Sequence, residues 1–136
     1  MPPKEESLSQ LVGNPRAEIK AVRLGISPRQ VEIFLEDNKF GIKETLKCLA
    51  ISPSSFFLKK KNRAKLNREM TEKFLRFVHV LKQAEKTLES LPEATAWLYR
   101  QIPSLNSQRP IDLLDTEPGH KLVEQTLLQI EYGIYG

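Results

Sequence analysis

The sequence predicts an all-α protein, in which a helix-turn-helix bundle is followed by a small helical C-terminal domain. Helix start signals recur along the 136 residues, whereas the alternating runs of β-branched residues that are typical of strands do not occur. A stripe of apolar residues at spacings of three and four predicts one long helix from Leu66 to Leu88. Helices with one apolar face are expected to pack on one another around a shared core.

Start and stop signals define short helices in the N-terminal half. A helix is expected from Ala17 to Leu24, because Gly25 is a typical residue after a helix end. Ser27 begins the next helix, since Pro follows it at the first helical position and Gln30 stands at the spacing of a capping box. A further short amphipathic helix is expected after Gly41.

The C-terminal half contains the long helix and two later ones. Asn67 is the expected N-cap of the long helix. Ser90 opens the next helix, whose inner face is expected to extend to Ile102. Asp115 or Thr116 then caps a final amphipathic helix.

Residues 43–61 have the spacing of a helix-turn-helix, with two short helices joined by a tight turn. The turn would place Ile51 in the core. Phe56, with Phe57 or Leu58, would form the inner face of the second helix. Hydroxyl and basic side chains would then face outward, where they can approach base edges and phosphates. The expected DNA-binding residues are Ser54, Ser55, Lys59, Lys60, Lys61, Arg63 and Lys65.

The net charge of +4 conceals a division along the chain. Residues 59–76 contain eight basic and two acidic residues, whereas residues 91–136 contain six acidic and three basic ones. A basic segment attracts a polyanion, and the acidic end would be repelled by one. A solvated surface run is the alternative explanation of the basic segment, but the division of charge favours DNA binding.

These signals divide the chain into three parts. A flexible tail is expected over residues 1–14. The helix-turn-helix region, which would bind DNA and dimerise, extends over residues 15–89 and includes the long helix. A C-terminal domain occupies residues 90–136 and carries the acidic charge.

Few side chains could support catalysis or hold a cofactor. His79 and His120 have no histidine or cysteine at ligand spacing, and no Gly-rich phosphate loop is present. We therefore expect no enzyme activity, no metal and no cofactor. The single Cys48 cannot form an internal disulfide, and no apolar run reaches the length of a spanning helix or a signal peptide. A cytoplasmic protein without membrane association is expected.

The C-terminal end is apolar where most chain termini are polar and fray. Ile130, Tyr132, Ile134 and Tyr135 lie close together at the end of the chain, with Gly133 between them and Gly136 after them. Such an end is expected to dock, either onto its own core or onto a partner protein. The choice between these two alternatives determines the function.

The sequence from Gly25 to Gly136 resembles the Xre/MbcA/ParS-type antitoxins, which neutralise RES-domain toxins. The most specific part of the resemblance is residues 96–98, 109–119 and 130–133, in that order and spacing. Residues 49–52 and 66–81 are similar to the Cro-like DNA-binding segment of that family.

The resemblance implies that a partner RES toxin consumes NAD and that this chain blocks its active site. It also implies operator DNA as a partner, a homodimer on that DNA and higher hetero-oligomers with the toxin. The residues expected to bind the toxin are Glu131, Tyr132, Gly133, Ile134, Tyr135 and Gly136. Ala50 stands where the family usually has Gly, and at positive φ an Ala would cost about 1 kcal/mol or more.

A stand-alone transcription regulator is the alternative to an antitoxin. In that case the C-terminal domain would serve only to dimerise, and the apolar tip would fold back onto its own core. Exposure of the tip in the free protein would favour the antitoxin.

Overall fold

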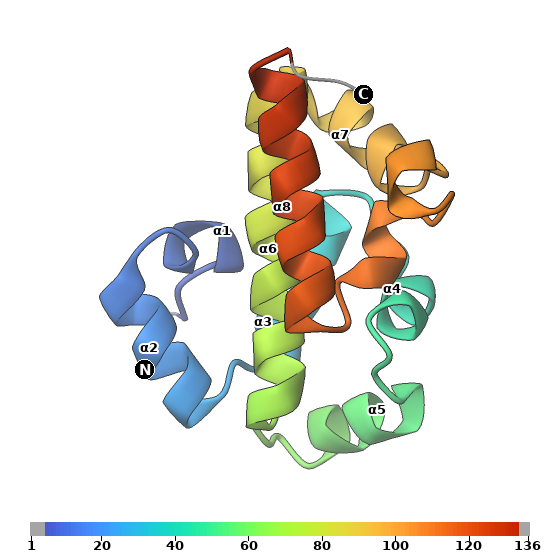
Figure 1. Cartoon of the computed structure of the whole chain (residues 1–136). Helices are drawn as coiled ribbons and strands as arrows, with labels where there is room; N and C mark the ends of the chain where they lie inside the picture. Colours follow the sequence, from blue (N-terminus) through green and yellow to red (C-terminus); the bar gives the residue numbers. More distant parts are fainter. Residues whose placement is uncertain (1–4, 134–136) are drawn as a thin grey trace. The chain divides into compact units, whose positions relative to one another are not determined.

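The computed structural model describes residues 5–133 and confirms the all-α fold (Figure 1). The chain divides into two compact units, Met1–Val78 and His79–Gly136, with the boundary inside the longest helix. The helices of the first unit are α1 (Leu8–Leu11), α2 (Pro15–Leu24), α3 (Pro28–Asp37), α4 (Ile42–Cys48), α5 (Pro53–Lys61) and the first part of α6 (Arg68–Leu88). The second unit contains the rest of α6, then α7 (Leu91–Leu98), the 3-10 helices η1 (Pro103–Leu105) and η2 (Pro110–Leu113), and α8 (Glu117–Glu131).

An aromatic cluster on α6 forms the core of the first unit. Phe77 makes edge contacts with Phe34 and Phe40, at ring-centroid distances of 6.2 and 5.1 Å. One turn earlier, Phe74 lies 6.2 Å from Phe56 of α5. The predicted apolar stripe of the long helix is therefore confirmed as a buried face, and aromatic rings of α3 and α5 pack on it.

Local caps begin most helices where the sequence predicts them. Ser27 and Gln30 form the expected capping box of α3. Asn67 accepts a hydrogen bond from the Met70 N–H at 2.8 Å, and Ser90 caps α7. Of the two candidates for the cap of α8, the structure selects Thr116, which accepts from the Gly119 N–H.

The described part of residues 1–14, where a flexible tail is expected, contains the short helix α1. Ser7 and Gln10 form a capping box at the start of α1, and the Leu8 and Leu11 side chains are buried within the first unit. The Gln30 side chain also donates a hydrogen bond to the Glu6 carbonyl oxygen at 2.7 Å. The Ser-x-x-Gln spacing was present in the sequence and is the signal that could have identified this helix.

Helix α7 ends at Leu98, earlier than expected, so Ile102 does not belong to its inner face. Ile102 instead forms an isolated antiparallel bridge with Gln108. Asn106 and Ser107 both adopt positive φ, and these two residues close the tight loop between Ile102 and Gln108. The chain therefore turns back after α7 and leads into η2.

Candidate functional site

Helices α4 and α5 are joined by a tight turn over residues 49–52. Ala50 has a φ of 54°, and the next residue, Ile51, is buried as expected. Ser52 caps α5 by accepting a hydrogen bond from the Ser55 N–H. Phe56 is the inward-facing residue of α5, whereas Leu58 points to solvent. The turn thus presents the start of α5 on the surface.

Lys73 holds this turn from inside the protein. Its ammonium group donates a hydrogen bond to the Ala50 carbonyl oxygen at 2.9 Å and pairs with Glu69 at 3.2 Å. Only 10% of the Lys73 side chain is exposed. Lys73 belongs to the basic segment by sequence, but its position excludes it from a surface that binds phosphate.

Replacing Ala50 by Gly should stabilise the first unit, because a left-handed residue with a Cβ costs about 1–2 kcal/mol. The greater freedom of Gly in the unfolded chain offsets part of that gain, so we expect a net increase of about 0.5–1 kcal/mol. Urea unfolding measures it. Ala17→Gly, inside helix α2, should have the opposite sign as a matched control. A destabilised A50G protein would contradict the strain at this position.

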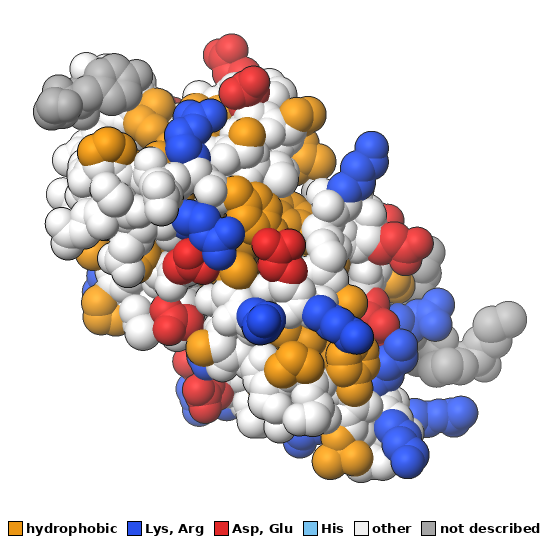
Figure 2. Space-filling view, turned by 90° about the vertical axis from the view of Figure 1, so that its right-hand side faces the viewer, with side chains coloured by type: hydrophobic (Ala, Val, Ile, Leu, Met, Phe, Trp, Pro, Cys, Tyr) orange, Lys and Arg blue, Asp and Glu red, His pale blue; other side chains and the backbone are white. Residues whose placement is uncertain are grey.

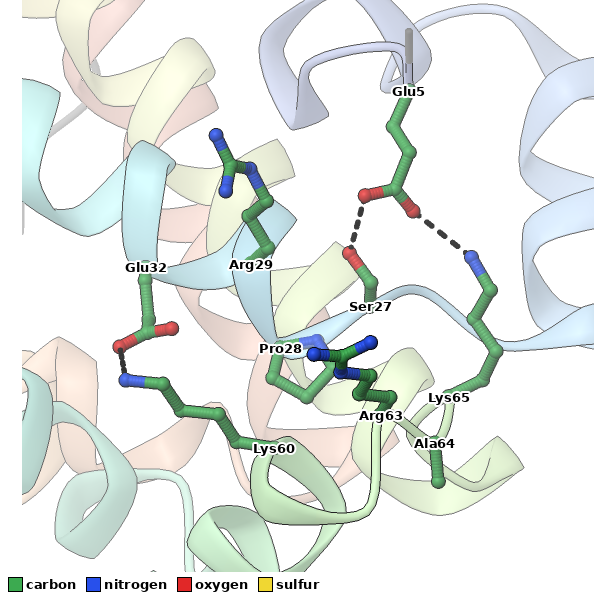
Figure 3. A pocket seen from close by; sticks show the side chains of 9 residues that line it. All are labelled: Glu5, Ser27, Pro28, Arg29, Glu32, Lys60, Arg63, Ala64 and Lys65. Atoms are coloured by element: carbon green, nitrogen blue, oxygen red, sulfur yellow. Dashed lines mark hydrogen bonds and ion pairs between the residues drawn. The ribbon is translucent and has the colours of Figure 1, made fainter. Parts of the chain in front are cut away.

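At least four of the eight basic residues in the segment 59–76 are paired with acidic side chains. Lys60 lies 2.8 Å from Glu32, and Lys65 lies 2.9 Å from Glu5 (Figure 3). The other two pairs are Arg68 with Glu72 and Lys73 with Glu69. The paired groups neutralise one another locally, so the segment presents less free positive charge than its sequence indicates.

Glu5 connects the N-terminal segment to the basic loop. Its carboxylate accepts hydrogen bonds from the Ser27 hydroxyl at 2.8 Å and from Lys65 (Figure 3). Burial raises the pKa of the Glu5 carboxyl, but these two hydrogen bonds, together with the positive charges of Lys65 and Arg29, outweigh burial and hold the pKa below its ordinary value. The paired side chains line a cavity of about 380 Å³ together with Arg29 and Arg63.

The remaining expected DNA-binding residues are accessible. Ser54 and Ser55 are exposed at the N-terminus of α5, and Lys61 and Arg63 are exposed at its C-terminal end. Lys59 is half-buried. Within residues 5–133, no carboxylate pairs with Lys59, Lys61 or Arg63. Figure 2 shows Lys and Arg side chains interspersed with acidic and hydrophobic ones, and most numerous in the lower part of the view.

The second unit is organised around η2 and the start of α8. Arg109 forms a two-point ion pair with Asp112, at 2.7 and 3.0 Å, and its guanidinium lies 5.6 Å from the centre of the Tyr99 ring. Gly119, in the first turn of α8, is buried directly against the Leu113 backbone. Residues 109–119 therefore form a packed segment that joins η2 to the start of α8.

Both histidines lie in the second unit and do not form a metal site. His120 is buried and pairs through Nε2 with Glu124 at 2.9 Å, and the His79 ring lies 6.4 Å from the His120 ring. Within residues 5–133, no group of three or more His, Cys, Asp or Glu side chains could hold a metal ion.

The two faces of α8 differ. Its inner face is buried at Val123, Thr126 and Leu127. The Gln83 side chain of α6 donates a hydrogen bond to the Glu124 carbonyl oxygen of α8, and Figure 1 shows the two helices side by side. On the outer face, the Leu122 and Leu128 side chains are 51% and 44% exposed. Gln125 and Gln129 lie between them, also exposed. The outer face therefore carries apolar side chains at its edges, neutral amide groups between them, and the exposed charge of Lys121.

The end of α8 continues this exposed face. Tyr132, at the C-cap, is 73% exposed, and Glu131 beside it is also exposed. Gly133 follows with a φ of 70°, a conformation that ends helices and favours glycine. Of the expected toxin-binding residues, Ile134, Tyr135 and Gly136 lie outside the described part of the chain.

No helix within residues 5–133 has the length and apolar character needed to cross a membrane.

Comparison with known proteins finds a family match within the second unit. Residues 83–133 match the model of the antitoxin Xre/MbcA/ParS C-terminal toxin-binding domain. Over 131 residues, the chain is 25% identical to a protein of Sphingobium sp. (strain YBL2) named Prs ADP-ribosylating antitoxin. That alignment covers 90% of this chain and 82% of the relative.

Proposed function

We propose that this chain, whose second unit matches the toxin-binding domain of Xre/MbcA/ParS antitoxins, neutralises a RES-domain toxin by covering the cleft in which the toxin binds NAD. The observation that carries the proposal is the exposed apolar end of α8 inside the matched domain. Leu128 and Tyr132 lie one helical turn apart on it, and both side chains are open to solvent. Aromatic side chains at such positions are the usual anchors of protein interfaces.

The name of the Sphingobium relative refers to ADP-ribosylation, a reaction that takes ADP-ribose from NAD. This supports a partner toxin that consumes NAD. We assign no catalysis to the chain itself, and we place it in the cytoplasm, where NAD is available to such a toxin. The match to a toxin-binding domain favours this function over a regulator whose C-terminal domain only dimerises.

Co-expression with the cognate RES protein tests this function. We expect the two chains to co-purify and the cellular NAD pool to stay at the level of cells without toxin. A catalytically inactive toxin should co-purify equally well and provides the control for binding without NAD loss. Depletion of NAD despite a stable complex would contradict active-site occlusion.

We propose that the first unit binds operator DNA as a homodimer. Ser54 and Ser55 at the start of α5 would approach the bases, while Lys59, Lys61 and Arg63 would contact phosphates. Lys60 and Lys65, which were also expected to contact DNA, would first have to leave their carboxylate partners. A dimer follows from the short recognition helix, because one such helix reads few base pairs.

The salt dependence of DNA binding distinguishes these two groups of lysines. Lys61→Ala/Arg63→Ala should make the negative slope of log K against log salt shallower by about 2 per protomer, because each lost phosphate contact contributes about 0.9 to its magnitude. Lys60→Ala/Lys65→Ala removes the same charge and should change the slope less, since both groups are already neutralised. Fluorescence anisotropy across a salt series measures both. Equal slopes for wild type and the first variant would show that Lys61 and Arg63 do not contact DNA phosphates.

A further inference from the structure

Helix α2 carries charge and apolar side chains that nothing within residues 5–133 covers. Its exposed face consists of basic residues with one leucine and one isoleucine, namely Arg16, Ile19, Lys20, Arg23 and Leu24. Ile19 and Leu24 are 51% and 63% exposed, and no residue of the helix is buried. Arg16, Lys20 and Arg23 have no acidic partner in the described part of the chain.

The helix is nevertheless well defined at both ends. Asn14 caps its start, Gly25 ends it with a φ of 86°, and the Glu18 carboxylate accepts a hydrogen bond from the Gly13 N–H. A helix of this length is marginal in water without packing of an apolar face. Its inner side offers only the half-buried Ala17, Ala21 and Val22. These features indicate a helix whose exposed face meets a partner.

The outer face of the neighbouring helix α3 has the complementary character. Ile33 is 42% exposed, and the exposed Glu36 and Asp37 lie one turn further along the same face. Neither carboxylate is paired with a base within residues 5–133. Ile33 and Asp37 also line a groove between α1 and α3, which can receive an apolar side chain.

We propose that two copies of this chain dimerise through these faces, with α2 of each copy on α3 of the other. The arrangement places Lys20 and Arg23 of one copy against Glu36 and Asp37 of its partner, and it brings Ile19 and Leu24 onto Ile33. An exchange of this kind is two-fold symmetric and closes with two equal contacts. Pairing of α2 with the α2 of a second copy would instead bring three basic side chains of one copy against three of the other, and these would repel one another. The inference deepens the proposed DNA-binding dimer by assigning its interface.

Two charge-reversed variants test the pairing without DNA or toxin. Variant one carries Lys20→Glu/Arg23→Glu, and variant two carries Glu36→Lys/Asp37→Lys. Each alone places like charges together at both contacts, so the dimer dissociation constant should rise by about tenfold or more. A mixture of the two restores opposite charges at both contacts of the heterodimer. Sedimentation equilibrium on each variant and on the equimolar mixture measures the association.

We expect a dimeric wild-type protein, two weakened variants and a dimeric mixture. Circular dichroism should give unchanged helix content, because all four positions are exposed. A monomeric wild type, variants that dimerise like wild type, or a mixture that fails to dimerise would each overturn the α2–α3 pairing. If variant one stays dimeric, and a separate titration shows that it has lost DNA affinity, the pairing is overturned and the basic face of α2 binds phosphates instead. Because the measurement contains no DNA, failure of operator binding leaves its result unaffected.

Discussion

Replacing Gly119 by Ala will lower the free energy of unfolding of the second unit by about 3 kcal/mol, at the upper end for overpacked sites. A Cβ at Gly119 would overlap the carbonyl oxygen of Leu113 and lie 2.8 Å from its carbonyl carbon. Both atoms belong to the backbone of η2, so no side-chain rotation can relieve the contact. The start of α8 would have to move away from η2, against which it packs.

Thermal unfolding measures this effect, with an expected decrease in melting temperature of roughly 10 °C. Gly41→Ala is the matched control, because nothing lies within 4 Å of a Cβ at that position and its φ is negative. The control should change stability by less than about 1 kcal/mol. A G119A protein with the same melting temperature as the Gly41→Ala control would show that α8 can shift without loss of stability.

The elements set by local sequence were predictable, because a cap is determined by residues three positions apart. The capping box of Ser27 and the cap of α8 at Thr116 depend on such spacings. The apolar stripe of α6 depends equally on a local period. Helix α1 has the same kind of local signal, the capping box of Ser7 and Gln10.

The charge pairs of the first unit could not be predicted from the sequence. Lys65 pairs with a carboxylate sixty positions away, and Lys60 with one twenty-eight positions away. Such pairs form only when the packing of α1, α3 and α5 brings distant residues together, and the charge composition of a segment does not determine that packing. A count of bases in residues 59–76 therefore overstates the positive charge available to DNA. The two-sided character of α8 was predictable, since its buried and exposed residues follow the helical period.

Removal of residues 132–136 will abolish toxin neutralisation while leaving the helices of both units in place. Tyr132 follows the last residue of α8 and contributes little to the core, with 73% of its side chain exposed. Its loss should therefore leave thermal unfolding and DNA affinity close to wild type. Loss of an aromatic anchor at the centre of an interface costs at least about 2 kcal/mol, so binding should weaken by more than tenfold.

Co-expression with the toxin and measurement of cellular NAD decide whether the tip or the helix face carries inhibition. Leu128→Glu tests the face one turn before the tip and leaves residues 132–136 intact, whereas Lys121→Ala changes an exposed charge near the start of α8 as a control. If the tip occludes the NAD cleft, the truncated protein should fail to protect NAD even when raised expression restores its complex with the toxin. Leu128→Glu should weaken the complex and recover protection as its expression rises. A truncated protein that still preserves the NAD pool would assign a structural role to the tip and place inhibition on another surface.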